Sequence, residues 1–294
     1  MNEHASGTPR RTAPMPYRSA RTPSGWQLPD GARVAVWVIP NVEFFPLDED
    51  IPGGRGRAPD VPAFAKRDYG GRVGFWRVFD ALAEHEVPPT TAFNREVLEA
   101  YPEVVAAMVE ARWEFMGHCN TNNRLLSEMS AEEEARTISE VAEGIEGATG
   151  TRPRGWLGAG LHERWTTLQR LDEAGYTYVA DWVNDDRPNT IEGTGLTSVP
   201  YSTEINDKPA FETWRMQSDE FADMALRQFE VLWRDSAQEP RVFAIALHPY
   251  LIGVPHRIDA LRRLLAELRT REGVWWATGS QIEDCYRQTR SNSA

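Results

Sequence analysis

Cysteines, long apolar runs and clusters of basic residues are all scarce in this chain of 294 residues. Its two cysteines, Cys119 and Cys285, are too few for a disulfide framework, and neither belongs to a CxxC metal motif. No segment approaches the roughly 20 consecutive apolar residues of a membrane span, and no apolar core of signal-peptide length lies near the N-terminus. We therefore expect a soluble, cytoplasmic protein that contacts no membrane.

The charge balance excludes another class of partner. The formal net charge is -12, and no basic cluster is longer than the pair Arg10-Arg11. A chain of this kind would repel the phosphate backbone of DNA or RNA. We expect no nucleic-acid partner and look for a small-molecule substrate instead.

The length suits one large α/β domain, and no stretch in the middle of the chain has the composition of a linker. Residues 1–25 are polar and rich in proline, which predicts a flexible tail. The remaining residues, 26–294, are expected to form a single catalytic domain.

Strand-prone and helix-prone segments alternate through this domain, which predicts an α/β fold with a parallel sheet. A loop rich in proline, glycine and aspartate is expected at 46–68. Strands are predicted at 34–39, 90–93, 113–116, 155–157, 176–180, 197–199, 242–247 and 274–277. Helices are predicted around 75–82 and at 102–112, 130–150, 166–174, 218–235, 258–269 and 280–288.

Four polar residues follow strand-prone runs: Glu43, His118, Asp181 and His248. In a parallel barrel the loops after the strands meet at one mouth, so these four are the predicted catalytic residues. A carboxylate after an apolar strand suits a base or a ligand, which is the role expected of Glu43. His248 precedes Pro249, which favours an extended backbone, and is the expected general acid; Asp181 is expected to orient its ring.

Other residues near these strand ends are expected to contact the substrate. Trp156 and Trp182 follow the same kind of run as the catalytic candidates, and either one can form a wall of the pocket. Asn122 and Tyr201 are the polar candidates.

Several short strings occur in an order that resembles the polysaccharide deacetylase superfamily of carbohydrate esterases, and more narrowly its allantoinase-like and imidase-like branch. They are Glu-Phe-Met-Gly-His at 114–118, Thr-Arg-Pro-Arg-Gly-Trp at 151–156, Ala-Asp-Trp at 180–182 and Ala-Leu-His-Pro at 246–249. The resemblance extends over roughly residues 25–285. It implies a distorted (β/α) barrel of about seven strands. It also implies hydrolysis of a non-peptide C–N bond in an amide, N-acetyl, cyclic imide or ureide group.

The resemblance also bears on the cofactor. Metal-dependent members carry an Asp-Asp pair and a His-x-x-x-His motif, but here Asn41-Val42-Glu43 stands at the first and Asn122 replaces the second histidine. One divalent ion, zinc or similar, would be held by Glu43 and His118, with Asn122 as a further ligand. Metal-independent hydrolysis is the alternative, and the sequence leaves both open.

Two alternative functions remain at this point. Cys119 could act as a nucleophile with His248 as its base, although the alternation of side chains along a strand predicts that Cys119 faces away from His118. A catalytically silent barrel that serves as a binding protein is the other. We favour an enzyme acting on a small amide, imide or ureide, and the sequence also allows a homo-oligomer.

Overall fold

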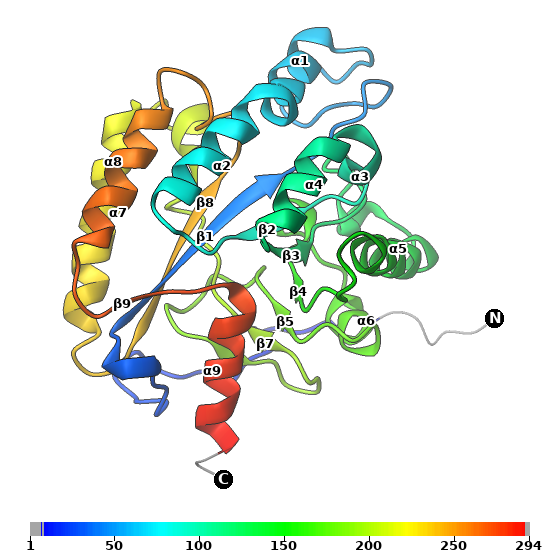
Figure 1. The fold of residues 1–294 in the computed structure, drawn as a ribbon. Helices are drawn as coiled ribbons and strands as arrows, with labels where there is room; N and C mark the ends of the chain where they lie inside the picture. The colour runs from blue at the N-terminus through cyan, green and yellow to red at the C-terminus, as the bar shows by residue number, and fades with distance from the viewer. Residues whose placement is uncertain (1–6, 8, 292–294) are drawn as a thin grey trace.

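The computed structural model describes residue 7 and residues 9–291, and a curled β-sheet lies at its centre (Figure 1). The sheet order is β6-β7-β5-β4-β3-β2-β1-β8, and β9 pairs with the first residues of β1. Neighbouring strands are parallel except β6, which runs antiparallel to β7. The strands are β1 (Val34–Val42), β2 (Thr90–Phe93), β3 (Glu114–Gly117), β4 (Gly155–Trp156), β5 (Tyr178–Val179), β6 (Asn189–Thr190), β7 (Thr197–Ser198), β8 (Arg241–Leu247) and β9 (Val274–Trp276).

The predicted distorted α/β barrel is confirmed. The predicted strands are present, and β6 is an addition that the sequence did not predict because Asn189–Thr190 lies in a polar segment without an apolar run. The sheet curls without a complete ladder between its ends. Asn206 forms an isolated parallel bridge with Ala246 of β8, and the Ala246 N–H donates to the Ile205 carbonyl over 2.9 Å. This bridge holds the segment after β7 beside the C-terminal end of β8.

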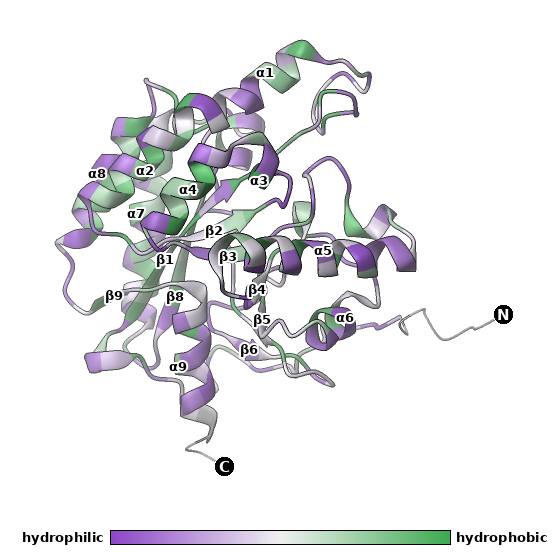
Figure 2. Ribbon diagram, turned by 45° about the vertical axis from the view of Figure 1, so that its right-hand side comes forward, coloured by the Kyte–Doolittle hydropathy of each residue, from purple (hydrophilic) through white to green (hydrophobic). Residues whose placement is uncertain are grey.

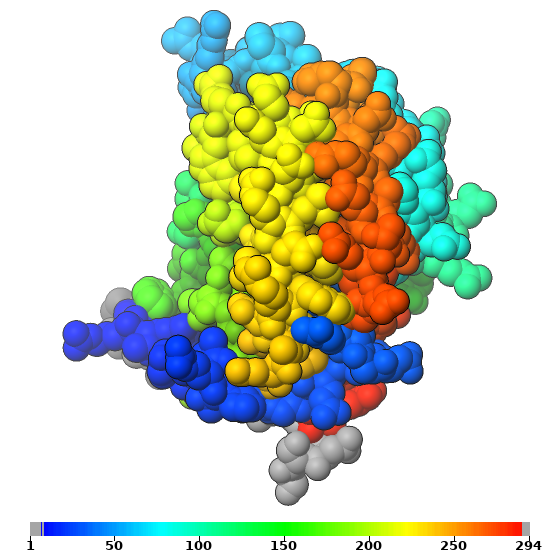
Figure 3. All heavy atoms as spheres, turned by 90° about the vertical axis from the view of Figure 1, so that its left-hand side faces the viewer, coloured from blue at the N-terminus to red at the C-terminus, as the bar shows by residue number. Residues whose placement is uncertain are grey.

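Helices cover the outer face of the sheet (Figure 1). α7 and α8 pack side by side, and α7 also contacts β8 (Figure 3). Among the described residues, no helix is long and apolar enough to cross a membrane. The helices are α1 (Val61–Tyr69), α2 (Phe75–Glu84), α3 (Val97–Ala100), α4 (Pro102–Glu110), α5 (Ala131–Thr149), α6 (Thr167–Glu173), α7 (Ser218–Asp235), α8 (Ile258–Arg269) and α9 (Gly279–Ser291).

Helix α1 corrects the predicted loop at 46–68. The Asp60 side chain accepts a hydrogen bond from the Ala63 N–H over 3.1 Å and caps the helix, and Pro62 occupies its first turn. Proline is tolerated there because the first helical N–H groups have no partner within the helix. The proline-rich composition therefore marked a helix start as well as a loop.

Each long strand separates two apolar cores. In β1, Ala35, Trp37 and Ile39 face the barrel interior. Val34, Val36 and Val38 belong to the outer cluster that packs against the helices. Figure 2 colours the ribbon by hydropathy, and hydrophilic residues are frequent along the helices that cover the sheet. This two-residue alternation decides which residue of each strand end points into the barrel.

The boundary predicted at residue 25 stays a prediction, and residues 1–6 and 8 lie outside the described part of the chain. Within that part, Met15 is buried against the outer cluster, and the Pro14 carbonyl accepts a hydrogen bond from the Glu192 N–H over 2.8 Å.

Candidate active site

Glu43 lies directly after β1, and three polar side chains from other elements surround its carboxylate. Its Oε1 accepts a hydrogen bond of 2.7 Å from the Asn122 amide. The Nε2 atoms of His118 and His248 lie 3.4 Å and 3.7 Å from the same oxygen, and these three side chains are at most 4% exposed. The prediction that Glu43, His118 and His248 meet at the strand ends is therefore supported by the geometry.

The ring of His118 is fixed by the backbone of the neighbouring strand. Its Nδ1 lies 2.7 Å from the Leu157 carbonyl, which can only accept a hydrogen bond. Nδ1 therefore carries the proton. Nε2 is then the nitrogen that faces Glu43. It can donate to this carboxylate only when the ring carries a second proton.

His248 is fixed in the same sense by Asp207. Its Nδ1 lies 2.6 Å from Asp207 Oδ1, and Asp207 Oδ2 accepts hydrogen bonds from the N–H groups of His248 and Ile252. Asp207 has no exposed surface. Three hydrogen bonds to the Asp207 carboxyl group fix this contact and hold the imidazole with its Nε2 toward Glu43.

The prediction that Asp181 orients His248 is wrong, and the sheet order gives the reason. Asp181 follows β5, which β1, β2, β3 and β4 separate from β8. Asp207 instead comes from the segment that bridges to β8 at Ala246. The sequence analysis did not predict a role for Asp207, since this residue does not directly follow a predicted strand.

Asp181 supports the other histidine indirectly. Its Oδ1 accepts a hydrogen bond of 2.7 Å from the Gly158 N–H, next to the Leu157 carbonyl that holds His118. Its Oδ2 is buried, and no N–H group or alcohol hydroxyl donates to it. Asp181 thus braces the turn after β4 and also lines a pocket with Trp182.

The local charges keep Glu43 ionised. Burial raises the pKa of Glu43, but His248, His118 and Lys208 together outweigh burial and leave this pKa below its usual value. Burial dominates at Asp207, whose pKa is raised despite the contact with His248. An ionised Glu43 beside two imidazoles is the arrangement that a general base requires.

The substrate-binding candidates divide into two groups. Trp182 lines a pocket, and its Nε1 donates to Glu163 over 3.0 Å. Asn122 contacts Glu43, while the Tyr201 hydroxyl is paired with the Asn41 amide in the barrel interior.

Trp156 does not line the site, so the prediction that Trp156 forms a wall of the pocket is wrong. Its place in β4 points it outward, where it is fully buried against Tyr176.

A metal ion does not fit this set of side chains. The second histidine position of the family is occupied by Asn122, whose amide nitrogen donates to the one carboxylate at the first position. Among the residues that the structure describes, no three His, Cys, Asp or Glu side chains form a group suited to a metal ion.

Cys119 lies on the opposite side of its strand end from His118. It belongs to the outer, helix-facing cluster, and burial raises the pKa of its thiol to about 12. A thiol with such a pKa is almost entirely protonated near neutral pH, which disfavours the nucleophilic role.

Comparison with known proteins now adds to this geometry. A family model described as polysaccharide deacetylase matches residues 66–179. A Schizosaccharomyces pombe protein assigned to the polysaccharide deacetylases is 31% identical over 240 residues, which cover 74% of each chain. The chain belongs to the polysaccharide deacetylase family. It is therefore a deacetylase or amidohydrolase that acts on C–N amide bonds.

More distant relatives of this deacetylase-family chain share its fold. A peptidoglycan deacetylase of Helicobacter pylori is 21% identical over 79% of this chain and 89% of its own. The structure of a Pseudomonas aeruginosa PAO1 protein assigned to the same family has a TM-score of 0.80 at 23% identity, over 87% of this chain and 92% of that one. The allantoinase PuuE has a TM-score of 0.82 at 24% identity, over 92% and 95%.

Proposed function

We propose that this deacetylase-family enzyme hydrolyses the C–N bond of a small amide, cyclic imide or ureide. The observation that carries the proposal is the contact of Glu43 with two imidazoles, one of them held by Asp207. The similarity to an allantoinase over most of both chains supports a small substrate. So does the burial of the site, because a polymer has to reach its catalytic groups through an open groove.

The first step is attack by water. The Glu43 carboxylate accepts a proton from a water molecule as the water oxygen bonds to the carbonyl carbon of the substrate. The Asn122 amide donates to Glu43 Oε1, while Oε2 is buried without a hydrogen-bond partner. The free oxygen is the one assigned to receive the proton, and a tetrahedral intermediate results.

The second step breaks the C–N bond. Protonated His248 donates its Nε2 proton to the departing nitrogen, and the electron pair of the C–N bond stays on that nitrogen. Asp207 stabilises the charged ring before transfer, as a carboxylate does for the histidine of a hydrolytic triad. The proton held by Glu43 then passes to His248 Nε2 and restores both groups. The new carboxylic acid loses its proton to solvent, so the products are a carboxylate and an amine or amide.

A panel of substrates tests this proposal. Purified full-length protein is incubated with hydantoin, succinimide, a linear N-acetyl amine and a chitin oligomer, and Glu43→Gln protein serves as the inactive control. The expected result is hydrolysis of a cyclic imide or ureide that is lost in Glu43→Gln. Hydrolysis of the N-acetyl oligomer with no turnover of the cyclic compounds would instead assign the enzyme to polysaccharide deacetylation.

A further inference from the structure

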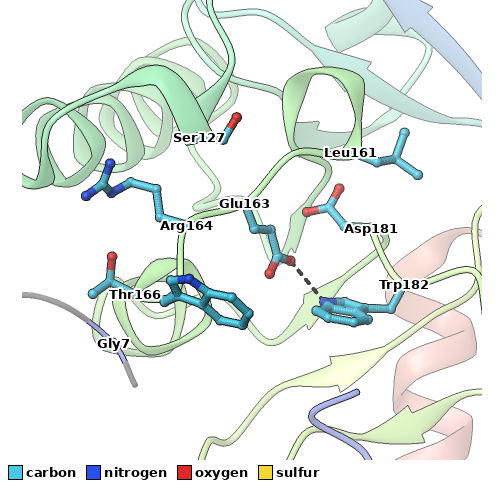
Figure 4. Close-up of a pocket in the computed structure, with 9 residues that line it drawn as sticks. Gly7, Ser127, Leu161, Glu163, Arg164, Thr166, Asp181 and Trp182 are labelled. Atoms are coloured by element: carbon cyan, nitrogen blue, oxygen red, sulfur yellow. Dashed lines mark hydrogen bonds between the residues drawn. The ribbon is translucent and has the colours of Figure 1, made fainter. Parts of the chain in front are cut away.

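A cavity of about 520 Å³ lies beside Asp181, at the C-terminal end of the sheet (Figure 4). Its wall includes two indole rings, of Trp165 and Trp182, and two carboxyl groups, of Glu163 and Asp181. Trp165 is 57% exposed, so the cavity is reached from solvent on that side. Glu163 played no part in the site expected from the sequence.

The two carboxyl groups face one another across this wall (Figure 4). Glu163 Oε1 accepts the indole N–H of Trp182 over 3.0 Å, and Asp181 Oδ1 accepts the Gly158 N–H over 2.7 Å. Asp181 Oδ2 is buried, and no N–H group or alcohol hydroxyl donates to it. A buried acceptor of this kind is costly unless something binds to it.

Among the described residues, no Lys or Arg side chain pairs with either carboxyl group. Arg164 lines the same cavity, but its guanidinium contacts Glu134 and donates to the Met129 carbonyl. His118 acts on Asp181 from the barrel side, and Glu134 acts on Glu163 as a further negative charge. Asp181 is buried and Glu163 is partly buried, and two adjacent carboxyl groups of this kind cannot both ionise at moderate cost when no described residue supplies a counter-ion.

Sharing one proton resolves this repulsion. Burial raises the pKa of Asp181 to about 7, and burial together with the charge of Asp181 raises the pKa of Glu163 well above its usual value. With the proton held between the carboxyl groups, the pair carries one negative charge. Its remaining lone pairs accept hydrogen bonds.

We infer that Glu163 and Asp181 together bind the N–H groups of a flat amide, imide or ureide ring that lies against Trp182. This inference rests on the proposed function and names the part of the molecule that selects the substrate. A planar ring suits an indole surface, and its N–H groups donate to the carboxyl lone pairs that the shared proton leaves free. Glu163 is thereby a substrate-binding residue that also holds Trp182 in place.

The test compares two probes that differ only in their N–H groups. Hydantoin has two ring N–H donors, and 1,3-dimethylhydantoin has none. Their dissociation constants are measured by tryptophan fluorescence on full-length Glu43→Gln protein, which does not turn them over. We expect hydantoin to bind about 10-fold more tightly or better, because hydrogen bonds to a charged acceptor contribute about 1.5–3 kcal/mol.

Three further variants, each made in the Glu43→Gln protein, test whether Glu163 causes the preference for hydantoin. Glu163→Leu keeps the bulk of the side chain without its polar atoms, and the preference should fall below about 3-fold. Glu163→Gln mimics the protonated acid and should retain the preference for hydantoin. Ser127→Ala, a change in the same cavity, is the matched control and should leave it unchanged.

Equal binding of the two probes, or no binding of hydantoin, overturns the inference. The inference is also overturned if the preference for hydantoin survives in Glu163→Leu. It is equally overturned if Glu163→Gln abolishes the preference as completely as Glu163→Leu does. The proposed function fails separately, when no cyclic compound is hydrolysed although the preference in binding is present. Conversely, if hydantoin is hydrolysed but binds no more tightly than 1,3-dimethylhydantoin, the inference is wrong and the proposed function still holds.

Discussion

His248 Nδ1 lies 2.6 Å from Asp207 Oδ1, and both side chains are buried. The contact fixes which ring nitrogen carries a proton and which one faces Glu43. Because the two residues are 41 positions apart in sequence, this pairing exists only once β8 and the segment before α7 have come together.

Replacing this carboxylate should impair the general acid. In Asp207→Asn, the charge that stabilises the protonated ring is lost, so kcat should fall by about 10²–10⁴-fold with a smaller change in KM. Steady-state kinetics against a cyclic amide substrate measure both values. An unchanged kcat would show that Asp207 does not assist catalysis. Circular dichroism checks that the variant is folded.

Chelators should not abolish activity. The family positions provide Glu43 and His118 but Asn122 in place of a third ligand of the usual kind, so any bound metal ion should be held weakly. Activity and melting temperature are measured after dialysis against EDTA and again after adding zinc, manganese or nickel. A loss of activity that stoichiometric metal restores would contradict this expectation.

Trp156 and Trp182 should respond in opposite ways to truncation. Trp156 is fully buried in the outer core, so Trp156→Ala should cost about 3–5 kcal/mol of stability and leave KM nearly unchanged in the folded fraction. Trp182 lines the cavity, so Trp182→Ala should raise KM by about 2–10-fold, as expected for a lost aromatic contact. Denaturant unfolding and kinetics on both variants decide the assignment. A raised KM in Trp156→Ala with normal stability would reverse it.

The pair of Asp181 and Glu163 should make stability depend on pH. The pKa of Asp181 is about 7 in the folded protein, above its unfolded value of about 3.9. A folded state that binds the proton more tightly loses stability as pH rises from about 4 through about 7, because the unfolded chain releases that proton first. Glu163→Gln removes one charge of the pair, so this loss should become smaller.

Melting temperatures of wild type and Glu163→Gln at pH 5 and pH 8 test this dependence. Between pH 5 and pH 8, the melting temperature of Glu163→Gln should fall by a few degrees less than that of the wild type. A change of about 1 kcal/mol in stability corresponds to about 2–4 °C in a chain of this size. Ser127→Ala provides the control. A difference between wild type and Glu163→Gln that is the same at both pH values would rule out the shared proton.

The sequence was sufficient for the strands and for three members of the site. Glu43, His118 and His248 follow strands long enough to show a period, and the two-residue alternation places them on the inner side. Asp207 and Glu163 were missed because neither follows a predicted strand: Asp207 begins a short helical turn and Glu163 lies in a loop. Their positions depend on long-range contacts, the bridge from Asn206 to Ala246 and the hydrogen bond from Trp182, which no local pattern encodes.

The turnover numbers of Glu43→Gln, His248→Ala and Cys119→Ser test the central claim most directly. On a cyclic amide that the wild type hydrolyses, the first two variants should lose about 10²–10⁴-fold in kcat with melting temperatures close to that of the wild type. Cys119→Ser should keep most of its activity, since its thiol faces the helices. Activity that survives in His248→Ala and disappears in Cys119→Ser would contradict acid–base catalysis by Glu43 and His248 and establish thiol chemistry instead.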